Sequence, residues 1–295
     1  MKKIISFVLS IIVISIFSCD KIDGPTRESI SVDTTCHFDV DNSAAVKKVL
    51  VEDYTGHNCG NCPEGGVILN DSMHNKYGDN LVVITVHAGD YANVCPGMNT
   101  CPPNSPAGSF AVDYKTTVGT DWHNAYGVFF YPAGMVDRID YPTSDHLKPK
   151  ESWDQEAQAR LNMSPKARIR IQNSFNDSDK KLRACIETKF LEELTGDYKL
   201  SVVITEDSVI DWQVWYGHPI ELVPDYVHHH ILRTALNTSF GVSVASGTTP
   251  INTTVVSGYS FTLDPSWNPD HCAVVAFVYN ATTREVLQVE EMKIK

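Results

Sequence analysis

Two cysteines that lie between a strand-like and a helix-like segment, Cys59 and Cys62, constrain this sequence more than any other feature. The apolar run that begins at Val49 predicts a buried strand, and the apolar spacing from Val67 to Met73 predicts a helix. A Cys-x-x-Cys motif at such a junction indicates a redox protein. The first turn of a helix carries unpaired N–H groups and a partial positive charge, which lower the pKa of the first thiol. The resulting thiolate is the species that attacks disulfides.

A metal site is the main alternative to redox chemistry. Cys-x-x-Cys is also half of a zinc site, but no second Cys-x-x-Cys and no His-x-x-x-His follows at zinc spacing. The adjacent residues His228, His229 and His230 also suggest a metal. Neighbouring residues of a strand point to opposite faces, however, so at most two of these side chains can share a site. We therefore expect no metal and no other cofactor. We interpret the interval from Ser208 to Gly258 as a large exposed loop or strand with polar and aromatic contacts, and as a candidate partner surface.

The N-terminus predicts export and lipid attachment. Two lysines precede an apolar run, residues 4–17, that is too short to span a bilayer and has the position of a secretory signal. The run leads to Cys19, and its last residues resemble the lipobox of bacterial lipoproteins, in which cleavage leaves a lipid-modified cysteine. An ordinary signal peptide with a chance cysteine is the alternative. We expect residues 1–19 to be a lipoprotein signal peptide that ends at the lipobox cysteine, and residues 20–44 to be a polar tether with a candidate short strand near Cys36.

The charge pattern argues against two classes of partner. The chain has 24 Lys and Arg against 36 Asp and Glu, a net charge of −12, and no basic stripe interrupts the acidity. Nucleic acids and anionic lipid surfaces both require clustered positive charge. We therefore expect no nucleic-acid partner, and we expect contact with the membrane to go through the lipid anchor.

The cysteine count fits an oxidising compartment such as a cell envelope, since the chain has 8 cysteines. If Cys19 carries lipid, an odd number is left and one thiol stays unpaired. The natural local pairs are Cys59 with Cys62 and Cys95 with Cys101, and the partners of three cysteines stay open: Cys36, Cys185 and Cys272.

Residues 45–163 predict a first domain of the α/β class. The nearly unbroken apolar run Leu81–His87 predicts a buried strand of a parallel sheet, which completes a strand–helix–strand unit. An inserted irregular loop, residues 88–118, then interrupts the pattern, and loops of this length inside a compact domain are often functional. A disulfide between Cys95 and Cys101 would staple this loop, either as a structural clip, which we favour, or with a redox role.

This first domain resembles the thioredoxin superfamily. In that family a Cys-x-x-Cys after the first core strand faces a cis-proline that opens a later strand, and Cys59, Cys62 and Pro132 match those positions. Asp53 matches the buried acid that helps to take a proton from the second cysteine. The resemblance implies a thioredoxin-like fold with a cis bond before Pro132. The sequence departs from the family at Asn61, where the family usually has proline.

The resemblance implies a role for each of these residues in thiol–disulfide exchange. Cys59 is the attacking thiolate, and Cys62 is the resolving thiol. Asp53 assists proton transfer, which requires burial to raise its pKa. Pro132 lines the site and lets a substrate strand pair there. His57 and Asn58 replace the aromatic residue that the family usually has before the first cysteine. Two alternatives stay open for His57: it stabilises the thiolate, or, as is more common, it is an exposed turn residue.

Residues 164–295 predict a second domain, which is all-β. A helical pattern over 153–161 closes the first domain, and from Lys166 onward apolar residues alternate with a period of two, as in half-buried strands. Six or more such strands, separated by tight turns, predict an immunoglobulin-like sandwich. Cys185 and Cys272 have a plausible spacing for a bridge between its sheets, but the alternation puts Cys185 on the outer face.

Both parts together give a closer resemblance. A lipobox, a Thr-Gly-His-Asn-Cys-Gly-Asn-Cys-Pro motif, a Phe-Tyr-Pro-Ala-Gly step, a Tyr-x-His-x-His-x-Leu-Arg segment and a C-terminal sandwich resemble a Bacteroidetes family of outer-membrane lipoproteins, the twenty-eight-kilodalton outer membrane proteins. The resemblance covers nearly the whole mature chain. It implies a lipid-anchored location at the outer membrane, on its periplasmic or its outer face. It implies little about activity, because members are mostly named for their location.

Two functions of different classes follow from these features. The first is an envelope thiol–disulfide oxidoreductase that acts through Cys59 and Cys62 on protein thiols or disulfides, which requires an accessible Cys59. The second is a non-catalytic binding or assembly module, in which the motif is a scaffold disulfide and the sandwich contacts an outer-membrane protein. The motif favours the first, so the sequence predicts a redox-capable protein and leaves open whether it is an enzyme.

Overall fold

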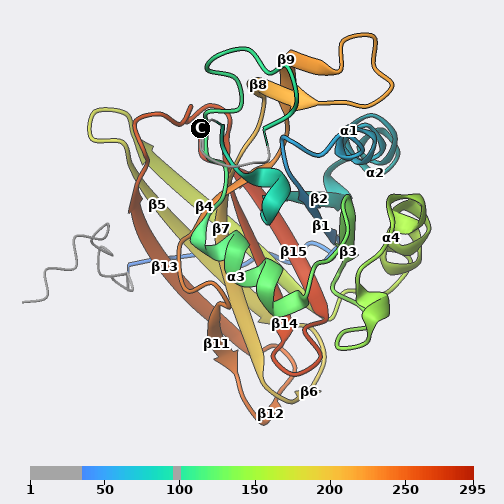
Figure 1. Ribbon diagram of the computed structural model, residues 1–295. Helices are drawn as coiled ribbons and strands as arrows, with labels where there is room; N and C mark the ends of the chain where they lie inside the picture. The colour runs from blue at the N-terminus through green and yellow to red at the C-terminus, as the bar shows by residue number, and fades with distance from the viewer. Residues whose placement is uncertain (1–34, 96–100) are drawn as a thin grey trace, which may run out of the picture.

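The computed structural model describes residues 35–95 and 101–295, which Figure 1 shows in colour. The predicted signal peptide, its lipobox cysteine Cys19 and most of the predicted tether lie outside these residues. The described chain has a small helical region in its first half and a mostly β-sheet C-terminal part, which agrees with the prediction in outline. Among the described residues, no helix is both long and apolar enough to span a bilayer.

A mixed sheet of eight strands lies at the centre of the described structure. Strand β1 (Val49–Thr55) runs parallel to β2 (Leu81–His87), so the predicted strand–helix–strand unit is confirmed. The short strand β3 (Ala133–Val136) is antiparallel to β1. The other strands are β7 (Tyr198–Glu206), β10 (Ile231–Ala235), β11 (Val242–Ala245), β14 (Cys272–Asn280) and β15 (Val286–Lys293). They lie in the order β15-β14-β7-β10-β2-β1-β3, and β11 also pairs with β7.

Helices cover both faces of the part of the sheet that contains β1. Helix α1 (Cys62–Val67), the π-helical segment η1 (Ile68–Met73) and α2 (His74–Tyr77) form one run, which packs with the predicted helix α4 (Trp153–Leu161) over Val49 and Val51. Helix α3 (Thr117–Tyr126) packs over Leu50 on the opposite face, as the alternation along a strand requires. The short 3-10 segments are η2 (Gly78–Asn80), η3 (Asp90–Ala92), η4 (Ser144–His146) and η5 (Lys150–Ser152).

A second sheet packs face to face against the C-terminal strands of the first. It contains β4 (Ala167–Asn176), β5 (Lys181–Phe190) and β13 (Thr254–Thr262), in the order β13-β5-β4. The predicted inward row of β5 is confirmed, because Leu182, Ala184 and Ile186 lie in the core between the sheets. Two further pairs are separate: β6 (Leu194–Thr195) with β12 (Thr248–Thr249), and the hairpin of β8 (Val209–Val214) with β9 (Leu222–His228).

Strands from both sides of the predicted boundary at residue 163 belong to the central sheet, because β10 lies between β2 and β7. The core under α3 is shared in the same way. Arg138 donates two hydrogen bonds to the Glu52 carboxylate, at 2.7 and 2.6 Å. Its guanidinium carbon lies 5.0 Å from the Trp122 ring and 4.8 Å from the Phe277 ring. Aromatic rings from both halves of the chain therefore enclose this ion pair.

A disulfide joins Cys36 to Cys185 of β5. The neighbours of Cys185 in the strand face the core, so Cys185 points to the outer face as predicted. It is nevertheless buried, because the N-terminal arm, residues 35–48, covers this face: Arg170 of β4 donates to the Asp39 carbonyl oxygen at 2.8 Å. The arm contains no strand, so the prediction of a short strand near Cys36 is wrong. Cys272 is a free, buried thiol.

Candidate functional site

Cys59 and Cys62 form a disulfide at the start of helix α1. Strand β1 ends at Thr55, and in the turn that follows the Cys59 N–H donates to the Gly56 carbonyl at 2.9 Å. Pro63 lies in the first turn of α1, where a helix has no use for its missing N–H. Each cysteine is only 3% exposed, so the disulfide is closed off from solvent in this conformation.

Pro132 lies beside the motif, and the peptide bond from Tyr131 to Pro132 is cis. The antiparallel register of β1 with β3 pairs Tyr54 with Ala133. The buried Pro132 directly precedes Ala133 in the chain and therefore lies next to the end of β1. Pro132 also faces α1, because a β-carbon at Gly65 would lie 3.4 Å from its Cβ atom. The structure therefore brings Pro132 to the strand end and the helix that carry the two cysteines.

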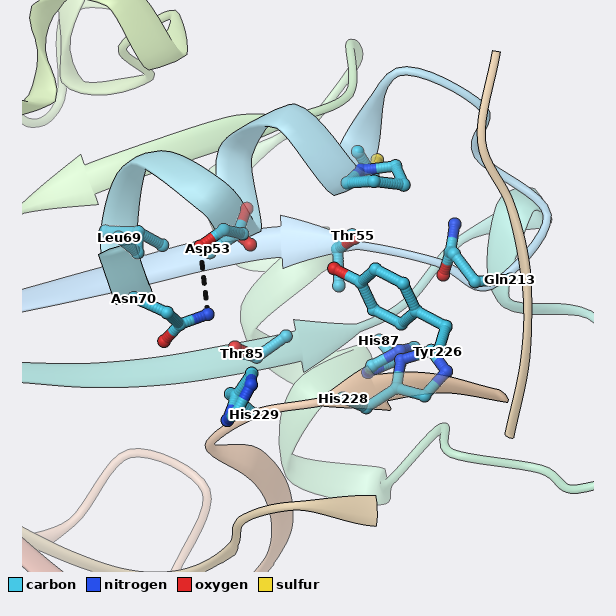
Figure 2. A pocket seen from close by; sticks show the side chains of 13 residues that line it. Asp53, Thr55, Leu69, Asn70, Thr85, His87, Gln213, Tyr226, His228 and His229 are labelled. Carbon is cyan, nitrogen blue, oxygen red and sulfur yellow. Dashed lines mark hydrogen bonds between the residues drawn. The ribbon is translucent and has the colours of Figure 1, made fainter. Parts of the chain in front are cut away.

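Asp53 and Cys62 line one small cavity, which Figure 2 shows between β1, β2 and the β8–β9 hairpin. The cavity has a volume of about 20 Å³, enough for about one water molecule. Oδ1 of the buried Asp53 has no hydrogen-bond partner among the described residues. Burial raises the pKa of Asp53 to about 7. A carboxyl that is partly protonated near neutral pH can give or take a proton within the cavity that Cys62 also lines.

Two buried histidines line the same cavity. His87 ends β2 and His228 ends β9, and their ring centroids are 5.5 Å apart (Figure 2). Neither nitrogen of His87 has a hydrogen-bond partner in the described part of the chain. Burial lowers the pKa of His228 to about 4 and that of His87 well below its usual range, so both rings are neutral at pH 7. Within residues 35–95 and 101–295, no group of three or more His, Cys, Asp or Glu could hold a metal ion.

His57 is buried, so the expectation of an exposed turn residue is wrong. The inserted loop covers its ring: Nε2 lies 2.9 Å from the Asn93 carbonyl oxygen, and the ring packs edge-on against Phe110 at 5.5 Å. Burial also lowers the pKa of His57. A neutral imidazole offers no positive charge to a Cys59 thiolate, so the structure does not favour the other alternative either.

The inserted loop, residues 88–118, closes one side of the Cys-x-x-Cys turn. It contains a disulfide between Cys95 and Cys101, and Cys95 packs with Phe110 in a small apolar cluster. A β-carbon at Gly56 would lie 2.3 Å from the carbonyl carbon of Tyr91, so the loop approaches the turn too closely for any residue but glycine. The glycine at position 56 therefore allows the inserted loop to pack directly against the turn.

The β8–β9 hairpin closes the other side of the turn (top of Figure 1). The Gln213 side-chain amide donates to the Cys59 carbonyl oxygen at 3.0 Å. The prediction of an exposed segment holds for its outer residue Ile210, which is 67% exposed, but is wrong for Gln213 and His228, which are buried. No local pattern predicts this contact, since 154 residues separate Gln213 from Cys59. A spacing of two residues puts Tyr226 and His228 on the same face of a strand, and this spacing is a sequence signal for their shared surroundings.

Comparison with protein families matches residues 120–295, more than half of the chain, to the family described as outer membrane protein Omp28. The chain belongs to the Omp28 family. The resemblance drawn from the sequence motifs is thereby confirmed, and the predicted lipid-anchored location at the outer membrane agrees with this family. The matched region begins after Cys59 and Cys62, so membership of the Omp28 family does not itself concern the motif.

Solved structures give weaker likenesses. A domain of the outer membrane lipoprotein Omp28 from Porphyromonas gingivalis is 23% identical, with 44% of this chain and 89% of that chain covered and a TM-score of 0.31. The E. coli curli protein CsgC is 8% identical, with 43% and 95% covered and a TM-score of 0.21. A calcium-binding mutant of Bacteroides uniformis beta-glucuronidase 2 is 14% identical, with 43% and 12% covered and a TM-score of 0.23. At such TM-scores the likeness supports no conclusion about activity. No curated protein matches the chain.

Proposed function

We propose that the protein is an outer-membrane lipoprotein, anchored through Cys19, that exchanges disulfides with protein thiols through Cys59 and Cys62. The observation that carries the proposal is the cavity shared by Cys62 and Asp53, which gives the leaving sulfur an acid with a pKa of about 7. Burying a carboxyl without a partner destabilises a protein, so a purely structural disulfide gains nothing from this neighbour. A proton donor beside Cys62 is, in contrast, useful in every cycle of exchange.

The proposed exchange proceeds in two steps. A substrate thiolate attacks Sγ of Cys59, the Cys59–Cys62 bond breaks, and Cys62 leaves as a thiolate that takes the proton of Asp53. A second substrate thiolate then attacks the substrate sulfur of the mixed disulfide, which yields a substrate disulfide and the Cys59 thiolate. The substrate loses two electrons and the protein gains them as a dithiol, so a protein disulfide of higher reduction potential must reoxidise it. The same steps in reverse reduce a substrate disulfide.

We also propose the finer fold assignments as part of this function. The parallel β1–β2 pair with its intervening helix, and the cis-proline ahead of β3, support a thioredoxin-like domain over residues 45–163. The two facing sheets with antiparallel β4, β5, β7 and β14 support an immunoglobulin-like sandwich over residues 164–295. In this proposal Pro132 lines the thiol site, and no nucleic acid takes part.

A non-catalytic module is the second candidate, and the closure of the site favours it. A disulfide whose cysteines are each 3% exposed is also what a scaffold requires. In that case the exposed side chains of the hairpin, Ile210, Tyr216 and Ile220, would join the sandwich in contacting an outer-membrane protein.

The reduction potential of the Cys59–Cys62 pair distinguishes the two candidates. The mature lipidated protein, in detergent, is equilibrated in glutathione and dithiothreitol buffers, and alkylation followed by mass mapping reads each cysteine. The Cys36–Cys185 disulfide serves as an internal structural reference. A potential between about −120 and −270 mV supports exchange, whereas a pair that stays oxidised below about −300 mV is a scaffold.

A trapping experiment then tests for substrates. In Cys62→Ser the mixed disulfide at Cys59 cannot be resolved, so covalent adducts with envelope proteins should accumulate. The double variant Cys59→Ser/Cys62→Ser is the matched control and should accumulate none. Equal adduct levels in both would count for the non-catalytic module.

A further inference from the structure

The end of β8 and the two residues that follow it cross the Cys-x-x-Cys turn and make main-chain contacts of the kind that an extended peptide makes. The Val214 N–H donates to the His57 carbonyl at 2.8 Å, and the Tyr216 N–H donates to the Gly60 carbonyl at 2.9 Å. Trp215, between them, donates in the opposite direction to the Glu221 carbonyl of its own hairpin at 2.8 Å. This alternation is that of a β-strand edge, with every second N–H directed at the turn.

The turn is shaped to receive this strand. A β-carbon at Gly60 would lie 2.5 Å from the Tyr216 ring, and one at Gly66 would lie 2.8 Å from the Tyr226 hydroxyl oxygen. With the bond from the Gln213 amide to the Cys59 carbonyl, the hairpin segment Gln213–Tyr216 supplies one donor to each of the carbonyl oxygens of residues 57, 59 and 60. The contact therefore combines two main-chain hydrogen bonds and one side-chain hydrogen bond with two tyrosine side chains that lie against glycines.

The hairpin is also built as a separable unit. β8 and β9 pair with each other and with no strand of the central sheet among the described residues. The residues that bound the hairpin, Ser208 and His230, have left-handed backbone angles, with φ of 57° and 52°. Such angles are unfavourable for residues with a side chain and are frequent at points where the chain changes direction. The two bounding residues are thus suited to act as hinges.

We propose that the segment Gln213–Tyr216 occupies the substrate position of the Cys59–Cys62 disulfide, and that the substrates are extended, cysteine-containing polypeptide segments that displace it. The proposal rests on the thiol exchange proposed above and names its substrate class. An extended segment can present alternate N–H groups to the His57 and Gly60 carbonyls, so the hydrogen bonds lost with the hairpin are replaced. A small dithiol without peptide N–H groups replaces none of them and has to wait for spontaneous opening.

Peptide thiols with selective N-methylation test the substrate class on the wild-type protein. A short extended peptide with one central cysteine is prepared in two methylated forms, one at every second amide and one at the intervening amides. Both forms keep the thiol, but each lacks the N–H donors on a different edge of the extended peptide. We expect one form to reduce Cys59–Cys62 about tenfold more slowly than the unmethylated peptide, and the other to match it, since a tenfold change corresponds to about the net strength of one hydrogen bond.

Hairpin variants test the displacement itself. Tyr216→Ala removes the ring that lies over Gly60, and Tyr216 is 58% exposed, so the change is tolerable for folding. Gly60→Ala introduces a β-carbon that pushes the same ring away. Both should raise the rate of Cys59–Cys62 reduction by dithiothreitol about tenfold, and the double variant should add little to either, because the two changes remove one contact. Ile210→Ala, on the exposed side of the hairpin, is the control and should leave the rate unchanged.

The outcomes separate this inference from the function on which it rests. If the pair exchanges readily but both methylated peptides match the parent, or if Tyr216→Ala and Gly60→Ala react at the wild-type rate, the substrate position is not the one proposed while the thiol exchange stands. If no thiol reduces the pair in any variant, including those with an opened hairpin, the thiol exchange is wrong and the inference is overturned with it.

Discussion

Arg138 and Glu52 are joined by two hydrogen bonds inside a core that excludes water, and neither side chain is more than 1% exposed. Removing one partner would leave a buried charge without compensation, which typically costs about 3–5 kcal/mol. We therefore expect Arg138→Met to lower the free energy of unfolding by about that amount, measured by urea denaturation at pH 7.

The exposed ion pair of Lys76 with Asp154 is the matched control for this change. Both of its side chains are nearly half exposed, so Lys76→Met should lower the free energy of unfolding by less than about 1 kcal/mol. Comparable losses in Arg138→Met and Lys76→Met would show that the burial of the first pair does not matter.

Asp53 should make stability depend on pH with a defined sign. Its pKa is about 7 in the folded protein against an ordinary 3.8, and a raised folded value gives stability that is complete below pH 3.8 and is lost as the pH rises through 7. The full difference corresponds to roughly 4 kcal/mol. We expect Asp53→Asn to be more stable than wild type at about pH 8 and to lack the wild-type decline between pH 4 and 7. If the free energy of unfolding, measured by urea denaturation, changed with pH by the same amount in both proteins across this range, the raised pKa of Asp53 would be contradicted.

The Cys36–Cys185 disulfide should contribute more stability than the Cys95–Cys101 disulfide. The first spans a sequence separation of 149 residues and the second only 6, and the entropy removed from the unfolded chain grows with the loop that is closed. We expect Cys36→Ser/Cys185→Ser to lose roughly 5 kcal/mol and Cys95→Ser/Cys101→Ser roughly 2 kcal/mol in urea denaturation. A reversed order would mean that packing, not loop closure, governs both bonds.

Cys272 should be unreactive in the folded protein. Its side chain is fully buried, and burial raises the pKa of the thiol to about 12, so almost no thiolate is present at pH 8. The mature lipoprotein should show no fast reaction with dithionitrobenzoate until urea unfolds it. Cys272→Ala should then abolish the thiol signal that appears on unfolding. A fast signal from the native protein that this variant removes would contradict the burial.

The parts of this fold that were predictable are those encoded in local patterns. The run Leu81–His87 is apolar at nearly every position because β2 is covered on both faces, and this gave the parallel strand. The alternation around Leu182 and Ile186 likewise gave the inner row of β5, and with it the outward direction of Cys185. Cys59 and Cys62 are predictable from their spacing at a strand–helix junction, whereas Asp53 and Pro132 follow from the resemblance to the thioredoxin superfamily. The structure brings these residues together.

The parts that were missed depend on contacts between distant segments. Nothing near Gln213 in the sequence indicates that its amide reaches Cys59, and nothing near Ile231 indicates that β10 pairs with β2. Arg138 follows a short strand as a single basic residue, and only the folded chain shows the aromatic rings around it. Cys36 could not be paired because its arm has no periodic pattern from which a neighbour could be inferred.

The disulfide between Cys36 and Cys185 also determines which strand would bear a mechanical force applied to the N-terminus. Tension on the lipid anchor predicted at Cys19 would reach Cys36 first and pass covalently into β5, the middle strand of its three-stranded sheet. A middle strand is held by hydrogen bonds on both edges, so the load would be shared between two ladders and would not peel the arm away residue by residue. Strand β1 begins after this disulfide-linked arm, so the Cys-x-x-Cys turn that follows β1 would be shielded from movements of the membrane.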